Sequence, residues 1–564
     1  MLGDFPGRLS LRHRKEDPRT CSSIDTHSSV SDNPSRSRAL STASPPERDA
    51  PAGDVLRDPR VQRGHRALQP LPFRRHRHRQ ALHQPRRRRA GDARDGGLLR
   101  RGTAGGPRKH RRVPGPGPLR PKPGKLPEDL IVFRPVPRGI FLALLTASVG
   151  LRVFLATLPG YVSDVESYKR WALGAAIAGL PAAYEVTGVD YPPLFLYALY
   201  GAGRIQRWIE PESTPADLRD SALFTFLVKS PHLIFDLLLG GLLYWLVAVR
   251  GLWGTARTGV AWGRLVALLY LWNPAVLFGS GYWGQPDGIH SALAVAALAA
   301  LAWDRAAASG ALLSFAGLMK PLAAPLVPLL VLAAGARRGL RGLVLAGGGG
   351  LAAALLTLLP FLATGRIGPV LRKILLDVEA MPFTSVNAHN LWWLLGAWRD
   401  ANAPILGPLT PRTIGLTLFL VSYAALLTRA ARLLRSPRID AGALCARLFL
   451  GAAAVVCSFF FLSTHMHENH MFLAIPLLLA VAGRSRHLAW LALGCSLAVF
   501  FNMALHDLEL PYCMPSFLSM PVPVTNRHLD RPFTLLQLVG SYLNTLLVAA
   551  VSASTWLCAW RGKV

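Results

Sequence analysis

The sequence of 564 residues is poor in charge, since Asp, Glu, Lys and Arg make up 17% of it and hydrophobic residues make up 51%. A soluble domain usually carries about 25% charged residues, so this deficit excludes a water-facing surface over most of the chain. Acidic residues are especially scarce, with 32 Asp and Glu against 63 Lys and Arg. The six cysteines match neither a disulfide framework nor a zinc-ribbon spacing, and no glycine-rich nucleotide-binding motif is present.

The first 130 residues differ in composition from the rest. They hold 30 of the 63 Lys and Arg residues and include the basic runs 74–79 and 86–89. Such a segment buries too little apolar surface to offset its ordering entropy, so we predict a disordered basic N-terminal tail. A phosphate-binding arm for RNA or lipid headgroups is one interpretation. A solvated cytoplasmic tail is a second interpretation. The third is upstream sequence translated from an over-extended start, which the almost exclusive use of Arg and the lack of a recognisable signal peptide suggest.

Residues 131–564 contain repeated apolar stretches of membrane-spanning length. A spanning helix needs about 20 mainly apolar residues. Two further segments, 218–231 and 308–335, have the pattern of short or broken helices, so the sequence predicts an all-α polytopic membrane protein with 12 to 14 transmembrane helices. The apolar stretches are 138–158, 191–209, 232–249, 261–280, 286–303, 342–363, 411–430, 441–463, 469–483, 487–505 and 533–558.

The positions of basic residues predict the orientation. Short loops rich in Lys and Arg stay on the cytoplasmic side of a membrane. The opposite face then holds or borders 12 of the 19 acidic residues that follow position 130. We expect the protein to lie in the cell (inner) membrane. Its acidic, irregular face should be directed toward the periplasm or the exterior. It comprises the loops 159–190, 281–286, 364–410, 464–468 and 506–531.

Polar residues that interrupt the apolar pattern mark a candidate site, because ionisable groups at membrane depth usually face a cavity. Asp164 lies in the first outer loop, at the start of an amphipathic segment. It either caps that helix or acts as a general base just outside the membrane. Asp190 and Tyr191 precede two prolines, a pattern that favours helix initiation with Asp190 as the cap.

A second group of polar residues lies near the predicted membrane surface. Trp283 suits an interfacial belt, and Asp287 either caps the next helix or binds sugar hydroxyls together with Gln285. Lys320 and Lys229 lie in apolar surroundings. Each either extends its amine to water or meets an anion such as a phosphate.

Two later loops complete the set. Asn387 and Asn390 suit contact with a sugar, although the tryptophans that follow them also suit membrane-interface anchors. One interpretation of His467, Glu468 and His470 is a metal site. However, the histidines at 465, 467 and 470 have offsets of two and five residues, which spread the rings over more than one helix face, so donors to a phosphate or sugar are favoured over a metal.

In this order, the segments resemble the GT-C superfamily of polyprenyl-phosphate-sugar-dependent glycosyltransferases. The likeness is closer to bacterial relatives of GPI mannosyltransferase II and more distant to the dolichyl-phosphate-glucose glucosyltransferases. It extends over about residues 138 to 505. Seven short motifs carry it: the Asp164 loop, 190–193, 231–236, 283–287, 320–321, 387–392 and 467–468.

The resemblance implies a GT-C type bundle over 131–564 and an inverting hexosyltransferase whose first outer loop is catalytic, with mannose as the favoured sugar. Asp164 would be the catalytic base. Relatives usually follow His-Glu with a basic residue, whereas Asn469 stands here, so phosphate binding would fall to His470, Lys320 or Lys229. The implied substrate-binding residues are Asp190, Tyr191, Trp283, Gln285, Asp287, Lys320, Asn387, Asn390, His467, Glu468 and His470.

The implied partners are a polyprenyl-phosphate-linked sugar donor, an acceptor that is a glycolipid, a polysaccharide or a protein, and the lipid bilayer. A lipid-linked donor agrees with the missing nucleotide-binding motif. No cofactor, metal or nucleic acid is expected. The alternative is a secondary transporter of a polar or anionic solute, because broken helices with buried Lys or Asp residues also line transport paths.

Overall fold

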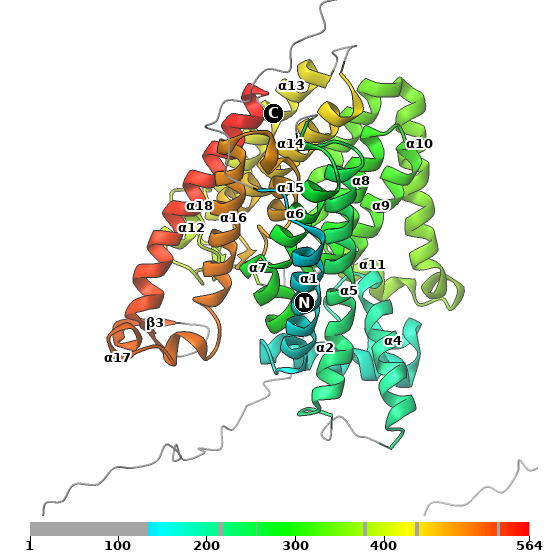
Figure 1. The fold of residues 1–564 in the computed structure, drawn as a ribbon. Helices are drawn as coiled ribbons and strands as arrows, with labels where there is room; N and C mark the ends of the chain where they lie inside the picture. The colour runs from blue at the N-terminus through cyan, green and yellow to red at the C-terminus, as the bar shows by residue number, and fades with distance from the viewer. Residues whose placement is uncertain are drawn as a thin grey trace, which may run out of the picture. The chain divides into compact units, whose positions relative to one another are not determined.

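The computed structural model describes residues 134–562, except 213–217, 255–256, 376–380, 435–438 and 527–530. The predicted tail therefore lies outside the described residues. The described part is mainly helical and includes two small two-stranded sheets (Figure 1).

The elements follow one another in this order: α1 (Arg138–Thr157), α2 (Val162–Ala178), η2 (Leu180–Ala182), α3 (Ala183–Val186), α4 (Pro193–Ile209), α5 (Ala222–Ala248), α6 (Val260–Leu271), α7 (Pro274–Val276), η4 (Leu277–Trp283), α8 (Asp287–Ala302), α9 (Ala306–Met319), η5 (Pro321–Leu326), α10 (Val327–Ala363), α11 (Ile367–Leu375), β1 (Ser385–Val386), α12 (Leu391–Leu394), α13 (Pro411–Leu434), α14 (Ala441–Leu462), β2 (Met466–His467), α15 (Ala474–Val481), η6 (Ala482–Arg484), α16 (Arg486–Ala504), η7 (Leu510–Tyr512), α17 (Ser516–Ser519), β3 (Pro521–Asn526), β4 (Arg531–Thr534) and α18 (Leu535–Arg561).

Seven helices in the described part are long and apolar enough to cross a membrane, or eight if the pair Val260–Leu271 and Pro274–Trp283, bent by 48°, forms one span. Large apolar side chains cover their outer faces: Leu340 is 76% exposed, Leu356 64% and Val421 66%. Water disfavours such a surface, whereas lipid tails match it. The chain is therefore a helical membrane protein.

The predicted count of 12 to 14 spans is not confirmed. The segments predicted at 218–231 and 232–249 form one helix, α5, which accommodates Pro231 in its interior. α4 was predicted to span, but its 17 residues include Arg204 and Arg207 and it is not among the candidate spans. α8, α9 and the α15–η6 segment are apolar but shorter than 18 residues.

The backbone breaks sharply within α10. Gly339 has φ 54° and ψ −142°, a left-handed conformation that glycine adopts without strain. A Cβ placed on Gly342 would lie 2.3 Å from the carbonyl oxygen of Ala334, although eight residues of continuous helix rise about 12 Å. The chain therefore turns back at Gly339. The break falls between the two segments that the sequence predicted at 308–335 and 342–363.

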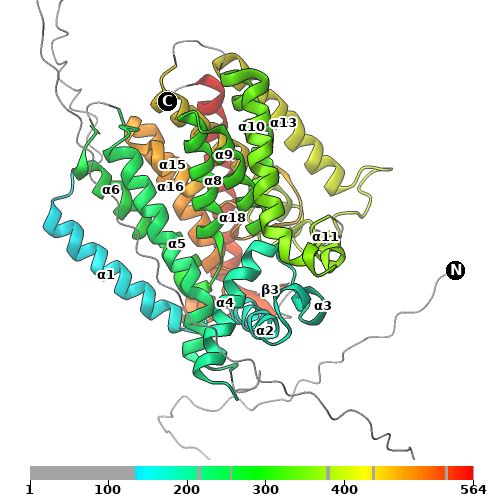
Figure 2. The same ribbon diagram turned by 90° about the vertical axis from the view of Figure 1, so that its right-hand side faces the viewer.

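Short helices gather at one end of the bundle. α2, α3, α4 and α11 lie together in Figure 2, with α2 packed on α4 and α11 in contact with α3. The strands β1 and β2 pair in parallel, so that Ser385 lies opposite Met466 and Val386 opposite His467. Two predicted outer loops that are far apart in sequence therefore meet.

Candidate functional site

A cavity of about 540 Å³ collects residues from four of the five predicted outer loops and from Lys320. The fifth loop, 506–531, contributes none of its lining. Three of the twelve predicted site residues, Trp283, Asp287 and Asn390, lie behind the wall. The other nine line the cavity: Asp164, Asp190, Tyr191, Gln285, Lys320, Asn387, His467, Glu468 and His470.

Asp164 lies in the first turn of α2 and is half-buried. The helix cap is Tyr161, and no side chain makes a capping hydrogen bond there, so the capping interpretation of Asp164 is wrong. Instead, Oδ2 of Asp164 accepts hydrogen bonds from Nε2 of Gln285 and, at 3.3 Å, from Nε1 of Trp283. The carboxylate is held by residues from the segment that precedes α8.

The environment of Asp164 tunes its basicity. Burial raises the pKa of this carboxyl to about 6, against the lowering effects of the Trp283 hydrogen bond and the charge of Lys320. A general base works best when its pKa lies near the operating pH. Asp164 therefore remains mainly ionised at pH 7 and is a stronger base than an ordinary aspartate.

Gln285 connects Asp164 to the rest of the site. Its Oε1 accepts hydrogen bonds from Nζ of Lys320 at 3.3 Å and from the hydroxyl of Tyr191 at 3.4 Å. The backbone reaches this position through Gly284, whose left-handed conformation (φ 94°) ends η4. The Gln285 amide thus joins the Asp164 carboxylate to the Lys320 amine.

Lys320 owes its position to the proline that follows it. Because a proline disfavours the helical conformation of the preceding residue, α9 ends here and Lys320 is extended (φ −153°, ψ 129°). Its Nζ donates to Oδ1 of Asp287 at 2.6 Å, and Asn469 donates to Oδ2 of Asp287 at 2.7 Å. The anionic partner expected for Lys320 is thus Asp287, which is 1% exposed and sits behind the cavity wall.

Glu468 is buried, and its side chain lines the cavity. No described side chain forms an ion pair or hydrogen bond with its carboxyl. Burial raises the pKa of Glu468 to about 8, and the nearby charge of Asp164 contributes to this rise. Glu468 is therefore largely neutral at pH 7 and can donate a hydrogen bond to a ligand.

His470 contributes no positive charge to the cavity. Nδ1 of His470 accepts a hydrogen bond from the backbone N–H of His467 at 3.2 Å, and burial lowers the pKa of His470 well below its usual value. His470 is therefore neutral at pH 7. Within the described ranges, no group of three His, Cys, Asp or Glu residues is placed to hold a metal ion.

The two predicted asparagines have different positions. Asn387 lines the cavity in a left-handed conformation (φ 59°) that asparagine tolerates, and its Oδ1 accepts from Nε1 of Trp398 at 2.9 Å. Asn390 is 0% exposed and caps α12, while its Nδ2 donates to the carbonyls of Phe460 and Ser463. Asn390 therefore fixes the loop from behind and does not reach the cavity.

Lys229, one of the phosphate partners expected from the sequence, also lies outside the cavity lining. Its side chain is 0% exposed, and its Nζ donates to the carbonyl oxygens of Leu158 and Tyr282, each at 2.7 Å. Backbone carbonyls, and not a ligand, satisfy this amine.

Sequence reasoning missed several cavity residues, among them Lys373, Trp398 and Arg412. Lys373 lies on α11, near Asp190. Burial raises the pKa of Asp190, and the charge of Lys373 opposes this rise. The signal for α11 was present, since residues 367, 370 and 374 repeat apolar side chains at helical spacing. Arg412 and Trp398 belong to no motif that could have been recognised.

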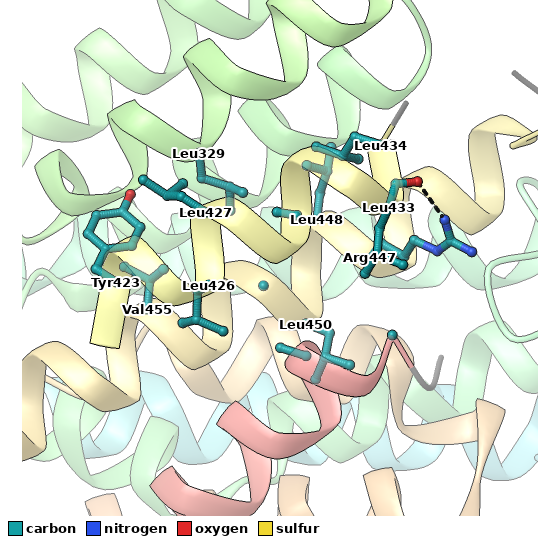
Figure 3. A pocket seen from close by; sticks show the side chains of 14 residues that line it. Leu329, Tyr423, Leu426, Leu427, Leu433, Leu434, Arg447, Leu448, Leu450 and Val455 are labelled. Atoms are coloured by element: carbon teal, nitrogen blue, oxygen red, sulfur yellow. Dashed lines mark hydrogen bonds between the residues drawn. The ribbon is translucent and has the colours of Figure 1, made fainter. Parts of the chain in front are cut away.

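A second, smaller pocket of about 40 Å³ lies between α13 and α14 (Figure 3). Half of its 14 lining residues are leucine. Nη1 of Arg447 donates to the carbonyl of Leu433 at 3.0 Å. None of the predicted site residues lies in this pocket. The predicted residues that line a cavity therefore all line the larger one.

No known family model matches the chain, and a search of curated proteins found no significant match. What the cavity can do is therefore inferred from its own residues and contacts.

Proposed function

We propose that the protein is an integral-membrane glycosyltransferase of GT-C type, which transfers a hexose from a polyprenyl-phosphate carrier to an acceptor hydroxyl with inversion, on the non-cytoplasmic side. One observation carries the proposal: Asp164 borders a large cavity with both of its side-chain donors, from Trp283 and Gln285, on the same oxygen, Oδ2. Its Oδ1 keeps lone pairs for an incoming hydroxyl.

The proposed reaction is a single displacement. The acceptor hydroxyl attacks the anomeric carbon while its proton passes to the Asp164 carboxylate. A bond forms between the acceptor oxygen and the anomeric carbon, and the bond from that carbon to the phosphate oxygen breaks with its electron pair. Attack opposite the leaving group inverts the anomeric centre. The enzyme has to align the two substrates, accept one proton and stabilise the departing phosphate.

The cavity offers groups that suit a phosphate. Lys320, Lys373 and Arg412 line it and bring positive charge. The charge of Lys320 is partly balanced by Asp287, and that of Lys373 lies near Asp190. Neutral Glu468 adds a hydrogen-bond donor without adding negative charge. This set makes a metal ion unnecessary for neutralising the leaving group.

The membrane setting suits a lipid-linked donor. Leu416 of α13 and Phe459 of α14 line the cavity, and both helices are long and apolar enough to span a membrane. Leu322 of η5 lies in the same wall. An isoprenoid chain can therefore remain in an apolar environment while its phosphate and sugar enter the polar part of the cavity.

The test supplies the full-length protein, reconstituted in vesicles, with polyprenyl-phosphate-linked mannose or glucose carrying a label. We expect label to move into an acceptor, with mannose preferred and the anomeric configuration inverted. The same vesicles are assayed for uptake of labelled polar solutes. Uptake of a solute without any sugar transfer would contradict the proposal and support the transporter alternative.

A further inference from the structure

A buried amine holds the end of α1 against the segment that precedes α8. Lys229 projects from α5, and its Nζ donates to the carbonyl oxygens of Leu158 and Tyr282. Leu158 follows α1 directly, and Tyr282 lies in η4. This contact ties together two backbone segments that are distant in sequence.

Two glycines permit this close approach. A Cβ on Gly160 (φ 69°) would lie 2.2 Å from the carbonyl oxygen of Tyr282 and 2.7 Å from Nζ of Lys229. A Cβ on Gly284 (φ 94°) would lie 3.1 Å from Cε of Lys229 and 3.3 Å from the Val165 side chain. The backbone conformation and the lack of space both favour glycine. We call residues 158–161, Lys229 and residues 282–285 the Lys229 joint.

The joint leads directly to the proposed base. The backbone N–H of Tyr161 donates to the carbonyl of Trp283 at 3.3 Å, and the two rings stack with centroids 4.4 Å apart. The N–H of Asp164 in turn donates to the carbonyl of Tyr161 at 3.1 Å. Trp283 and Gln285, at the other side of the joint, donate to the Asp164 carboxylate. Both the backbone and the side chain of Asp164 are therefore fixed to the joint.

We infer that Lys229 is a positioning residue, which sets the orientation of the Asp164 carboxylate by holding the α1–α2 turn against residues 282–285. Lys229 lies outside the cavity lining and acts through Trp283 and Gln285. The inference rests on the proposed transfer reaction, in which Asp164 accepts the proton of the acceptor. It assigns a role in that reaction to a lysine whose contacts alone would suggest a purely structural residue.

The first test replaces Lys229 with Met, which keeps an unbranched side chain and removes the N–H donors to both carbonyls. A misplacement of about 1 Å can lower a rate about 100-fold, so we expect kcat to fall about 10- to 100-fold. The KM for the donor should change less than about threefold, because the cavity residues that face the donor phosphate remain. The inference would be overturned by an unchanged kcat, or by a fall in kcat/KM that comes only from a raised KM.

A second variant approaches the joint from its other side. Gly284→Ala places a methyl group against the Lys229 stem, and we expect the same split between kcat and KM with a smaller loss. The control is Arg447→Met. Arg447 also donates to a backbone carbonyl, but it lies in the pocket of Figure 3, which shares no lining residue with the cavity. We expect this control to keep the wild-type kcat.

A double variant separates positioning from damage to the fold. In the Asp164→Asn background the base is already missing, so adding Lys229→Met should lower the residual rate less than about twofold. A further loss as large as that in the wild-type background would show that Lys229 acts elsewhere and would overturn the inference. If the wild-type protein transfers no sugar, the proposed function itself fails, and the inference fails with it.

Discussion

Nε2 of Gln285 donates a hydrogen bond to Oδ2 of Asp164, a residue 121 positions earlier in the sequence. The other end of the same amide accepts a hydrogen bond from Lys320. An amide is suited to this place because it offers a donor to the carboxylate and an acceptor to the amine. The relationship couples the proposed base to Lys320 through a single side chain.

Replacing Gln285 should change the pH dependence of transfer. Gln285→Glu puts a second carboxylate beside Asp164, and like charges raise the pKa of a carboxyl group. The acid limb of kcat/KM should therefore move to higher pH, and the loss of activity should be greater at pH 6 than at pH 8. Profiles of kcat/KM against pH measure the shift. A variant profile that overlays the wild-type profile would show that Gln285 does not affect the base.

The acid limb of the wild-type enzyme should reflect Asp164. Transfer requires the ionised carboxylate, and burial raises its pKa from the ordinary 3.8 to about 6. As the pH falls through about 6, the base becomes protonated, so kcat/KM should fall about tenfold for each further pH unit. An activity that stays constant down to pH 4.5 would contradict this assignment.

The alkaline limb should depend on Glu468, if its neutral form donates a hydrogen bond to the donor phosphate. The pKa of Glu468 is raised to about 8, so the donor proton is present below pH 8 and is lost as the pH rises through that value. Glu468→Gln keeps an N–H donor that does not ionise. We expect it to retain most activity at pH 7 and to lose the alkaline limb.

The matched variant for this prediction is Glu468→Ala, which has no donor at any pH. We expect its kcat/KM to be low over the whole range. An alkaline limb that persists in Glu468→Gln would assign that limb to another group.

The buried pair of Lys320 and Asp287 should dominate the stability of this part of the fold. Removing one partner of a buried ion pair costs about 3–5 kcal/mol, because the other charge is left uncompensated. Lys320→Met should therefore lower the thermal unfolding temperature in detergent clearly. Adding Asp287→Asn removes the orphaned charge and should restore most of the loss without restoring transfer.

The control for the buried pair is Arg219→Gln, which removes the exposed contact with Glu166. Exposed pairs contribute little, so we expect the unfolding temperature to stay near that of the wild type. If Lys320→Met and the double variant lose stability equally, the uncompensated charge of Asp287 is not the cause.

The fold could be predicted from the sequence where one uninterrupted apolar stretch forms one helix. The stretches predicted at 138–158, 441–463 and 487–505 correspond to α1, α14 and α16 within one residue at each end. The prediction was wrong at α5, where the boundary drawn between 218–231 and 232–249 falls at Pro231, inside one continuous helix. A long helix packed among neighbours can accept the one missing hydrogen bond, and no local pattern distinguishes this case from a true break.

The site could be predicted largely because its residues interrupt apolar sequence. Asp164 and Glu468 are conspicuous in this way, and both line the cavity. Three-dimensional contacts decide whether a residue lines the cavity or lies behind its wall. The sequence therefore did not distinguish Gln285, which lines the cavity, from Asp287, which does not. The role of Lys229 is hidden for the same reason, since its partners are backbone carbonyls that have no sequence signature.

The central claim is that the Asp164 carboxylate accepts the proton of the acceptor hydroxyl, and one rate comparison tests it most directly. Purified wild-type protein and Asp164→Asn are supplied with the same labelled polyprenyl-phosphate sugar and acceptor, after their unfolding temperatures have been matched. Loss of a general base predicts a fall of at least about 100-fold in turnover with the fold retained. A well-folded Asp164→Asn protein that transfers sugar at nearly the wild-type rate would contradict the claim.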